Sequence, residues 1–290
     1  MVRMKKILLQ LEADPQASVF DQITAYDAGA DQVLAYGGVT ADEVANLVYG
    51  AMFTRGGDNL RNTAIFVGGA RVAPAETIMK QVLATFFGPV RVSVMFDANG
   101  CNTTAAALVR KVAGGGALAG KKALVLGGTG PVGVRVASLL AREGCQVALS
   151  SRQLLRAQEV CRRLAADAAI RVEPLQVAGA AEAAVALGQG INIVACCGAP
   201  GVRLLEQAAW SACPFLEVAA DINAVEPLGL EGIKVSDDGR ERQGKKVFGA
   251  IAIGNLKMKI HRAAVQALFA ANDRVLDLEA VYSLAKTLEN

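Results

Sequence analysis

The sequence predicts an α/β protein of two domains: a Rossmann dinucleotide-binding domain, and an α/β parallel-sheet domain completed by C-terminal helices. Two observations predict this class. Short apolar segments alternate with helix-forming segments along most of the 290 residues, as in βαβ units. In addition, one strand leads directly into a turn with three spaced glycines, Gly128-x-Gly130-x-x-Gly133, and a helix and a second strand follow that turn.

The first hundred residues contain four predicted strands, each followed by a predicted helix. Strands are predicted at 6–11, 32–36, 63–67 and 90–95, and helices at 19–28, 41–53, 74–86 and 103–112. Ser18 is placed to cap the first helix, and Thr40 with Glu43 has the spacing of a capping box for the second. This repetition of strand and helix predicts a parallel sheet.

Gly114-Gly115-Gly116 interrupts the pattern and is the expected hinge between the domains. We assign residues 114–255 to the dinucleotide domain and residues 1–113 with 256–290 to the substrate domain, because the chain tail is expected to rejoin the first domain. Further strands are predicted at 123–126, 146–149, 171–175, 191–196, 214–219 and 247–250, and further helices at 134–143, 253–270 and 278–288.

The glycine turn predicts where a dinucleotide binds. Gly128 permits the tight turn, Gly130 lets the backbone approach a pyrophosphate, and Gly133 lets the helix pack closely on the strand. The helix offers free N–H groups and the positive end of its dipole to the phosphates. A loop at residues 197–201 is expected over the nicotinamide ribose. The residues expected at this end of the site are Gly128, Thr129, Gly130, Pro131, Val132, Gly133, Cys197, Gly198 and Ala199.

The end of the next strand predicts which dinucleotide is preferred. An acidic side chain there would bind both ribose hydroxyls and repel a 2′-phosphate. The chain has Ser150, Ser151 and Arg152 instead, with Arg156 one helical turn further on. Hydroxyls and a guanidinium suit a phosphate dianion, so the sequence predicts NADP rather than NAD. The alternatives are a glycine turn in another doubly wound domain, and a Rossmann module that binds no nucleotide.

Composition and charge argue against several classes of protein. The chain is 53% apolar, and its net charge of +3 is too small to predict nucleic-acid binding. Residues 1–10 do not resemble a signal peptide and no run approaches the ~18 apolar residues of a membrane span, so a cytoplasmic location is expected. The six cysteines form no Cys-x-x-Cys pair, which favours free buried thiols. Because His261 is the only histidine, neither a histidine-based triad nor a metal site is expected.

Polar residues gather where predicted strands end, which is where ligands bind in open α/β sheets. The densest group, at 96–104, includes Asp97, Asn99, Asn102 and Thr103, which can hydrogen-bond a polar heterocycle. The alternative role for this group is to cap the helix that follows, with Asn102 or Thr103 as the capping residue.

The second half of the chain adds three candidates and one coincidental match. Asp221 and Asn223 follow a strand, and either face the nicotinamide or form an Asx-turn. Lys257, near the start of a long helix, is either a solvated surface residue or part of the site. Tyr282 and Lys286 match the Tyr-x-x-x-Lys pair of short-chain dehydrogenases but fall beyond the Rossmann segment, so we interpret the match as chance on an amphipathic helix.

The shortage of acids and bases favours a particular kind of substrate. Hydride removal from an alcohol needs a base, usually His, Tyr or Lys. A carbon between two amine nitrogens needs none, because a nitrogen lone pair expels the hydride and leaves an amidinium-like cation. The protein then mainly has to hold the two reacting carbons within ~3–3.5 Å and exclude water.

Six segments carry a resemblance to a known family: Ser18-Val-Phe-Asp21, Tyr26-Asp-Ala-Gly29-Ala-Asp31, Ala64-Ile-Phe-Val-Gly-Gly69, Asn99-Gly-Cys-Asn-Thr-Thr104, Gly127-Gly-Thr-Gly-Pro-Val-Gly133 and Phe248-Gly-Ala-Ile-Ala-Ile-Gly254. Over nearly its whole length the chain resembles the NADP-dependent methylenetetrahydromethanopterin/methylenetetrahydrofolate dehydrogenases of methylotrophic bacteria. The resemblance implies oxidation of a methylene-pterin to the methenyl cation, with hydride passing to NADP. It also implies a fold related to aminoacid-dehydrogenase-like proteins, a pterin in the cleft between the domains, and a homo-oligomer, often a trimer.

The resemblance also suggests roles for individual residues. Lys257 becomes the candidate catalytic residue, either hydrogen-bonding the pterin carbonyl or lying neutral against N5, because a protonated ammonium would oppose the forming cation. Asp21 and Asp97 become candidates for accepting hydrogen bonds from the aminopyrimidinone edge. The positions that match the lining of the family's cleft are Asn99, Asn102, Thr103 and Lys257. Tetrahydrofolate and tetrahydromethanopterin share the reacting core, so the sequence leaves the choice between them open.

Two other functions compete with this one. A dehydrogenase of the shikimate or quinate type shares the architecture but needs a Lys/Asp pair near the first strands, and Lys5 and Lys6 stand at the wrong end of a strand. A nucleotide-sensing or pterin-binding protein without turnover would keep the glycine turn. No cyclohydrolase activity is expected, because nothing here resembles the Tyr/Lys arrangement of the bifunctional dehydrogenase/cyclohydrolases.

Overall fold

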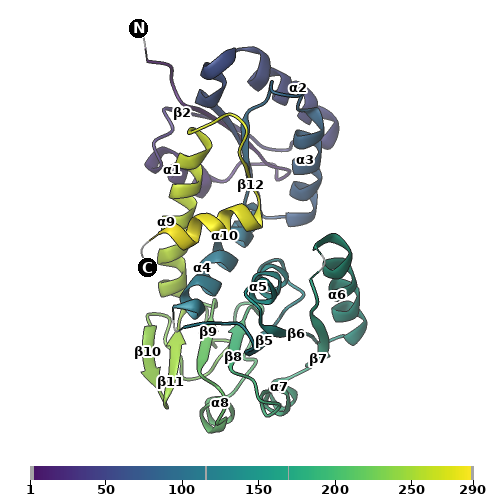
Figure 1. Cartoon of the computed structure of the whole chain (residues 1–290), viewed down its shortest axis with the longest axis vertical. Helices are drawn as coiled ribbons and strands as arrows, with labels where there is room; N and C mark the ends of the chain where they lie inside the picture. The colour runs from purple at the N-terminus through teal and green to yellow at the C-terminus, as the bar shows by residue number, and fades with distance from the viewer. Residues whose placement is uncertain (1–2, 115, 169, 289–290) are drawn as a thin grey trace. The chain divides into compact units, whose positions relative to one another are not determined.

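The computed structural model describes residues 3–114, 116–168 and 170–288 (Figure 1). The chain divides into two compact units: Met1–Thr103 with Met258–Glu289, called unit 1, and Thr104–Lys257, called unit 2. The expected glycine hinge includes residue 115, which lies outside the described residues. The division between the units falls within two helices, α4 (Cys101–Ala113) and α9 (Ala250–Leu268).

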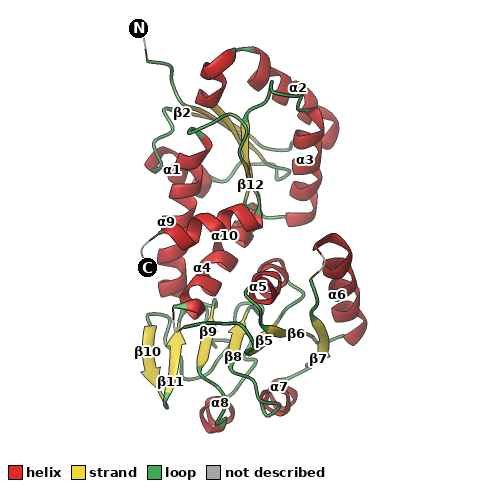
Figure 2. Cartoon of the chain, viewed as in Figure 1, coloured by secondary structure: helices red, strands yellow, loops and turns green. Residues whose placement is uncertain are grey.

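Unit 1 is built on a five-stranded sheet in the order β12-β4-β3-β1-β2, and every pair of neighbouring strands is parallel. Figure 2 shows strands of this sheet in yellow among the red helices of unit 1. The direction in which successive strands are added reverses between β1 and β3, so the topological switch point lies between the carboxyl ends of these two strands. The elements of unit 1 are β1 (Ile7–Leu11), α1 (Val19–Asp27), β2 (Gln32–Tyr36), α2 (Ala41–Phe53), the 3₁₀-helix η1 (Gly57–Asn62), β3 (Thr63–Val67), α3 (Val72–Thr85), β4 (Ser93–Phe96), the 3₁₀-helix η2 (Ala98–Gly100), β12 (Val275–Leu276) and α10 (Leu278–Thr287).

The register of this sheet determines which side chains share a face. Gln10 lies opposite Phe66, and Phe66 lies opposite Met95, so these three side chains point to one face. His261 of α9 stacks on Phe66, and Phe20 of α1 lies near the same histidine, so α1 and α9 cover that face. The tail of the chain completes the sheet, because β12 pairs with β4.

Unit 2 contains a seven-stranded sheet in the order β10-β11-β9-β8-β5-β6-β7. All neighbouring pairs are parallel except the hairpin β10–β11. From β7 to β11 this is the Rossmann order, with the switch point between β5 and β8. The elements of unit 2 are β5 (Lys122–Leu126), α5 (Pro131–Arg142), β6 (Gln146–Ser151), α6 (Leu154–Ala168), β7 (Glu173–Gln176), α7 (Ala180–Leu187), β8 (Ile193–Cys196), α8 (Gln207–Ala212), β9 (Val218–Asp221), β10 (Asp238–Arg242) and β11 (Lys245–Phe248).

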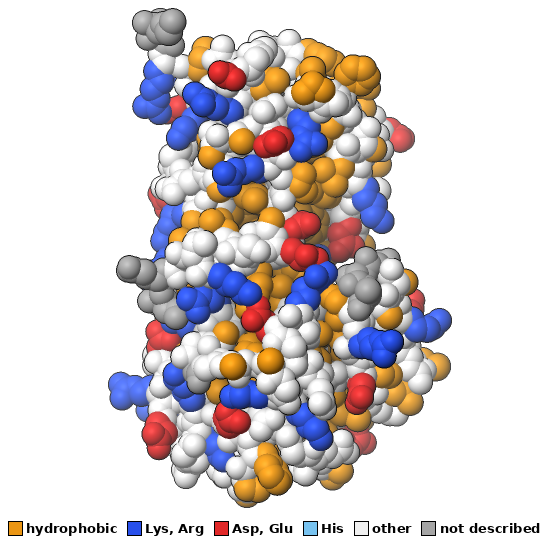
Figure 3. Space-filling view, viewed as in Figure 1, with side chains coloured by type: hydrophobic (Ala, Val, Ile, Leu, Met, Phe, Trp, Pro, Cys, Tyr) orange, Lys and Arg blue, Asp and Glu red, His pale blue; other side chains and the backbone are white. Residues whose placement is uncertain are grey.

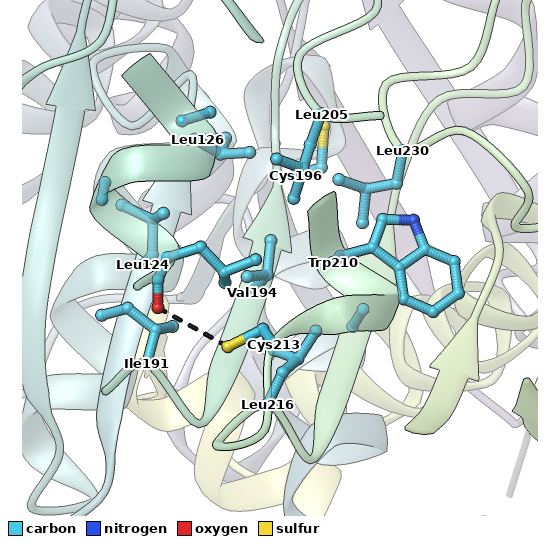
Figure 4. Packing of buried hydrophobic residues seen from close by; sticks show 14 of the residues in the cluster. Leu124, Leu126, Ile191, Val194, Cys196, Leu205, Trp210, Cys213, Leu216 and Leu230 are labelled. Atoms are coloured by element: carbon cyan, nitrogen blue, oxygen red, sulfur yellow. Dashed lines mark hydrogen bonds between the residues drawn. The ribbon is translucent and has the colours of Figure 1, made fainter. Parts of the chain in front are cut away.

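One apolar core of unit 2 surrounds the only tryptophan of the sequence. Trp210 is fully buried, and its indole N–H donates to the carbonyl of Glu231 at 2.8 Å. Figure 4 shows its ring beside Leu230, with Leu205 and Cys196 close by. Burial of such a ring contributes strongly to the hydrophobic stabilisation of this core of unit 2.

Most predicted elements are confirmed in type, with shifted ends. The helix after the glycine turn begins at Pro131 rather than at 134, because proline is favoured at the first helical position. The strand predicted at 90–95 is Ser93–Phe96, because Val90 instead forms a short bridge with Phe87. The strand predicted at 214–219 begins at Val218, and the long C-terminal helix begins at Ala250.

The surface and the cysteines agree with the composition. Figure 3 shows basic and acidic side chains interspersed over the visible face. All six cysteines are buried and carry free thiols, as predicted. Among the described residues, no helix combines the length and apolar character that a membrane crossing requires.

Candidate functional site

The glycine turn after β5 brings the backbone of three segments into contact. Gly127 has φ +67° and supplies the left-handed residue of the turn, a role that we had predicted for Gly128. Gly128 is instead required by packing, since a Cβ there would lie 2.6 Å from Cγ of Leu149. A Cβ on Gly133 would lie 2.6 Å from the carbonyl oxygen of Gly127, which confirms its predicted close packing.

Gly130 differs from its neighbours because the protein itself leaves room for a side chain there. A Cβ on Gly130 would meet its nearest atom, the carbonyl oxygen of Gly127, at an ordinary 3.5 Å. Gly130 is also the N-cap of α5, and it supplies no side chain to bond the N–H groups of the first turn. The start of α5 therefore presents the uncapped backbone N–H groups of Val132 and Gly133, since Pro131 has none, together with the positive end of the helix dipole. Such an arrangement suits a phosphate group.

The end of β6 lies beside this turn. The amide of Gly128 donates to the carbonyl of Ser150 at 2.9 Å, so the glycine turn and the strand end are directly joined. Ser150 and Ser151 are buried, whereas the side chains of Arg152 and Arg156 are exposed. Two hydroxyls and two guanidinium groups thus stand near the strand end without an acidic residue in the segment 146–156.

The loop after β8 packs against the same turn. Cys197 donates its N–H to the carbonyl of Leu126 at 2.8 Å, and a Cβ on Gly127 would lie 2.6 Å from Cα of Gly198. Burial, and then the nearby charge of Asp221, raise the pKa of the Cys197 thiol far above its ordinary value. This thiol is therefore protonated and is not a nucleophile. Ala199 follows on the exposed side of the loop.

Asp221 and Asn223 form the Asx-turn that we considered as an alternative. The amide of Asn223 donates to Oδ1 of Asp221 at 2.9 Å, and the amide of Leu230 donates to Oδ2 at 2.8 Å. Burial raises the pKa of Asp221, although hydrogen bonds to its carboxylate oppose the shift. Both residues are buried at the end of β9, next to the switch point of the sheet.

In unit 1, Asp97 caps helix α4, a role that we had assigned to Asn102 or Thr103 as the alternative to substrate binding. Its Oδ1 accepts from the amides of Asn102 and Thr103 at 2.9 and 3.0 Å, and its Oδ2 accepts from the Thr103 hydroxyl at 2.6 Å. The Asn102 amide group donates to the carbonyl of Phe96. Asn99 alone points outward, in a left-handed conformation with φ 53°, which asparagine tolerates.

A buried aromatic and ionisable cluster next to this cap could not be predicted from the local sequence. His261 is 1% exposed, and its Nδ1 lies 3.7 Å from Oδ2 of Asp97. Its ring stacks on Phe66 with centroids 5.4 Å apart, and the Phe20 centroid is 6.4 Å away. Phe20 is half-exposed, so the cluster has an apolar side open to solvent. The only sequence signal was that this histidine is unique.

Lys257 and Asp21 lie on the two helices that carry this cluster. Lys257 is partly buried and lies well inside α9 rather than near its start. It precedes His261 by four residues, so the two side chains lie on the same face of the helix. Asp21 is in the first turn of α1, whose predicted cap is confirmed by the bond from the Asp21 amide to Oγ of Ser18.

The Tyr282 and Lys286 pair has no catalytic geometry. Tyr282 is buried in α10, and the ammonium group of Lys286 lies 4.6 Å from the centre of its ring. This is a cation–π contact along one helix face. No group of three or more histidine, cysteine or acidic side chains suited to a metal occurs within the described residues.

Comparison with known proteins adds independent information. Residues 19–99 match the family described as methylene-tetrahydromethanopterin dehydrogenase, N-terminal. The chain is 47% identical to the bifunctional protein MdtA of Methylorubrum extorquens, over 98% of this chain and 99% of that protein. It is 30% identical to the NAD(P)-dependent methylenetetrahydromethanopterin dehydrogenase of the same organism, over 97% and 98% of the two chains.

Solved structures support the fold alone. The ligand-free 5-ketofructose reductase of a Gluconobacter strain superposes with a TM-score of 0.51 and 13% identity, covering 98% of each chain. That agreement extends over both sheets and confirms the predicted α/β class.

Proposed function

Because this chain belongs to the methylenetetrahydromethanopterin dehydrogenase family, we propose that it oxidises methylene-tetrahydromethanopterin or methylene-tetrahydrofolate to the methenyl-pterin, with hydride transfer to NADP. The observation that carries this proposal is the start of α5, whose backbone donors have no side-chain cap and where Gly130 leaves room for a Cβ. The family assignment does not support the shikimate-type alternative.

The residues of unit 2 fit the dinucleotide. The glycine turn and the start of α5 would hold the pyrophosphate, and the loop at Cys197, Gly198 and Ala199 would lie along the nicotinamide ribose. When bound, the nicotinamide ring accepts the hydride. The chain itself needs to provide no base for that step, since the substrate nitrogens supply the electron pair. This agrees with a single histidine that is buried beside Asp97.

The preference for NADP over NAD rests on the end of β6. Ser150, Ser151 and Arg152 would bind the 2′-phosphate, with Arg156 assisting from the first turn of α6. The named relative is dependent on NAD(P), which supports a nicotinamide cofactor in general. The finer preference is our proposal.

The pterin site is proposed in unit 1 and along α9. The half-exposed ring of Phe20 offers an apolar surface, and Asp21, Asn99 and Lys257 would bind polar edges of the heterocycle. Asp97, Asn102 and Thr103 are engaged with the start of α4, so we propose that they shape this region from behind. The Lys257→Ala variant should lose at least about tenfold in turnover or pterin affinity and keep binary NADP binding. A loss of NADP affinity alone would remove Lys257 from the pterin site.

We also propose that the protein is a cytoplasmic homo-oligomer. Large apolar side chains are exposed along unit 1, including Ile23 of α1 and Phe53 of α2. Beside the edge strand β2, a pocket of about 410 Å³ is lined by Leu34, Tyr36 and Leu47, among others. Exposed apolar surface of this kind marks protein contacts. The mass in solution, measured by light scattering during gel filtration, tests the proposal.

The decisive experiment follows the near-ultraviolet absorbance of the reduced nicotinamide. Formaldehyde-loaded tetrahydrofolate and tetrahydromethanopterin are each mixed with enzyme and with NADP or NAD. Reduction of NADP supports the reaction, and the faster pterin identifies the substrate. If none of the four mixtures shows reduction although NADP and NAD each bind to the protein, the protein is a nucleotide-binding protein without this activity.

A further inference from the structure

Asp221 has a buried carboxylate that accepts hydrogen bonds from the backbone of the loop that follows it, residues 222–230, here called the closed loop. It ends β9, is 1% exposed, and accepts backbone N–H groups from Asn223 and Leu230. Both donors belong to the loop 222–230, so one side chain determines the path of that loop.

Backbone hydrogen bonds join the closed loop to a second loop, which follows β8 and contains residues 204–205. The carbonyl of Gly229 accepts from the amides of Leu204 and Leu205 at 2.8 and 3.1 Å, and the amide of Glu231 donates to the carbonyl of Leu205 at 3.0 Å. Gly229 cannot be replaced without movement, since a Cβ there would lie 2.3 Å from Sγ of Cys196. The position of residues 204–205 therefore depends on the position of residues 229–231.

The second loop reaches the glycine turn. A Cβ on Gly198 would lie 2.4 Å from Cδ1 of Leu204, so the backbone of Gly198 packs directly on that side chain. On its other side, a Cβ on Gly127 would lie 2.6 Å from Cα of Gly198. A continuous series of contacts thus runs from Asp221 through Gly229, Leu204 and Gly198 to Gly127.

Resting on the proposed function, we propose that Asp221 is a positioning residue that fixes the nicotinamide half of the dinucleotide site through this series of contacts, without touching either reactant. The series ends where Gly198, after β8, packs on Gly127, after β5, and these two strands flank the switch point where the dinucleotide is proposed to bind. A carboxylate is suited to this role because it only accepts, and the converging amides of Asn223 and Leu230 each need an acceptor. An asparagine of the same size would direct its own N–H donors at some of them.

The test compares Asp221→Asn with the wild type and with Asp237→Asn. Asp237 is a second buried aspartate of unit 2, but its carboxylate accepts from the Lys234 amide and from Arg242, outside the series of contacts. Binary NADP binding is followed by the fluorescence of Trp210, the only tryptophan, which bonds to Glu231 beside the closed loop. The Michaelis constant for the pterin and the unfolding midpoint are measured in parallel.

We expect Asp221→Asn to weaken NADP binding by about tenfold, the usual consequence of losing a buried hydrogen-bond acceptor, and to leave the pterin Michaelis constant unchanged. Asp237→Asn should lower the unfolding midpoint and change NADP affinity by less than about twofold. Leu204→Ala, which breaks the series without altering Asp221, should also weaken NADP binding. The double variant should lose less than the sum of the two single losses.

Several results would overturn the proposal. A higher pterin Michaelis constant with normal NADP binding would show that Asp221 contacts the substrate. Equal NADP losses in Asp221→Asn and Asp237→Asn would show general destabilisation. If Asp221→Asn does not fold, normal NADP binding by Leu204→Ala decides against the series of contacts. A wild type that binds neither NADP nor NAD overturns the proposed function itself, and this role with it.

Discussion

Two strands of unit 1, β1 and β4, and one strand of unit 2, β5, are followed by residues of opposite chemistry. In unit 1, β1 and β4 are followed by carboxylates, at Glu12, Asp14 and Asp97. In unit 2, β5 is followed by the bare backbone of Gly127 and Gly128. Carboxylates repel phosphates and accept N–H groups, whereas a glycine turn at a helix start offers N–H groups to an anion. The comparison explains why the dinucleotide is assigned to unit 2 and a heterocycle with N–H edges to unit 1.

The same contrast extends to how the helices begin. In unit 1 the start of α1 is tied down by Ser18 and by Glu12, whose oxygens accept the Ser18 amide at 3.1 Å, and the start of α4 is tied down by Asp97. Helix α5 has no side-chain cap. The capped starts satisfy the helix from within, and the uncapped start leaves its donors for a ligand.

The largest effect is expected from a substitution at the uncapped start of α5. Gly130→Ala has room for its methyl group, so its stability should be normal, yet NADP binding should fall by about hundredfold, or about 3 kcal/mol, because the methyl occupies the ligand's space. Gly133→Ala is the matched control, since its methyl meets the Gly127 carbonyl and should lower the free energy of unfolding by about 2 kcal/mol. Isothermal titration and thermal unfolding measure the two quantities. Normal NADP affinity in Gly130→Ala would contradict the assignment of this helix start to the pyrophosphate.

The next largest effect is expected from removing the side chain that caps the start of α4. Asp97→Ala leaves two amides and one hydroxyl without their acceptor, so the free energy of unfolding should fall by about 3 kcal/mol, while binary NADP binding is retained. Asp97→Asn keeps one acceptor oxygen and should lose about half as much. Urea denaturation measures the loss. A raised pterin Michaelis constant with unchanged stability would instead make Asp97 a substrate ligand.

The sequence predicted the elements whose signals are local. The glycine turn, the capping residues Ser18 and Thr40, and the strand end at Ser150 all act within a few residues of themselves, and the structure confirms the predicted caps and the predicted turn. By contrast, β12 has only two residues and exists because it pairs with β4. The hairpin strand β10 is highly charged, and Gly244 in its turn was its only local signal in the sequence. In the structure Gln243 and Gly244 both have positive φ angles, which a two-residue hairpin turn requires.

The residues of the candidate site fall into the same two groups, those with a local sequence signal and those without one. The cofactor residues lie close together in sequence, so one motif with its flanking strands indicates most of them. Asp97 and His261 are brought together only by packing of distant segments, and no periodicity indicates that. The capping role of Asp97 was also missed, because its contacts skip over the short 3₁₀-helix η2 before reaching α4.

A smaller effect sharpens the electrostatic side of the comparison. Arg152→Ala should raise the Michaelis constant for NADP by about tenfold and leave that for NAD nearly unchanged, because only NADP has the phosphate that the guanidinium would bind. Arg163→Ala, which removes an exposed arginine of the following helix α6, is the matched control and should change neither constant. Steady-state rates with both cofactors give the ratio. Equal changes for NADP and NAD in Arg152→Ala would refute the 2′-phosphate assignment.

The smallest expected effect concerns pH and the acidic strand ends of unit 1. Hydrogen bonds from the Arg71 side chain and then from the Ala70 amide hold the pKa of Asp14 below its ordinary value of 3.8, which joins the end of β1 to the loop after β3. Since the folded-state pKa is lowered, this stabilisation is present above 3.8 and is lost as the pH falls through the folded-state pKa. The unfolding midpoint, followed from neutral pH to about pH 3, should therefore fall less steeply in Asp14→Asn than in the wild type. Arg71→Ala should reduce the slope in the same direction, because it removes the main donor. Because the pair is on the surface, the difference should also shrink in high salt, and a slope that is identical in all three proteins would show that this carboxylate contributes nothing to joining the two strand ends.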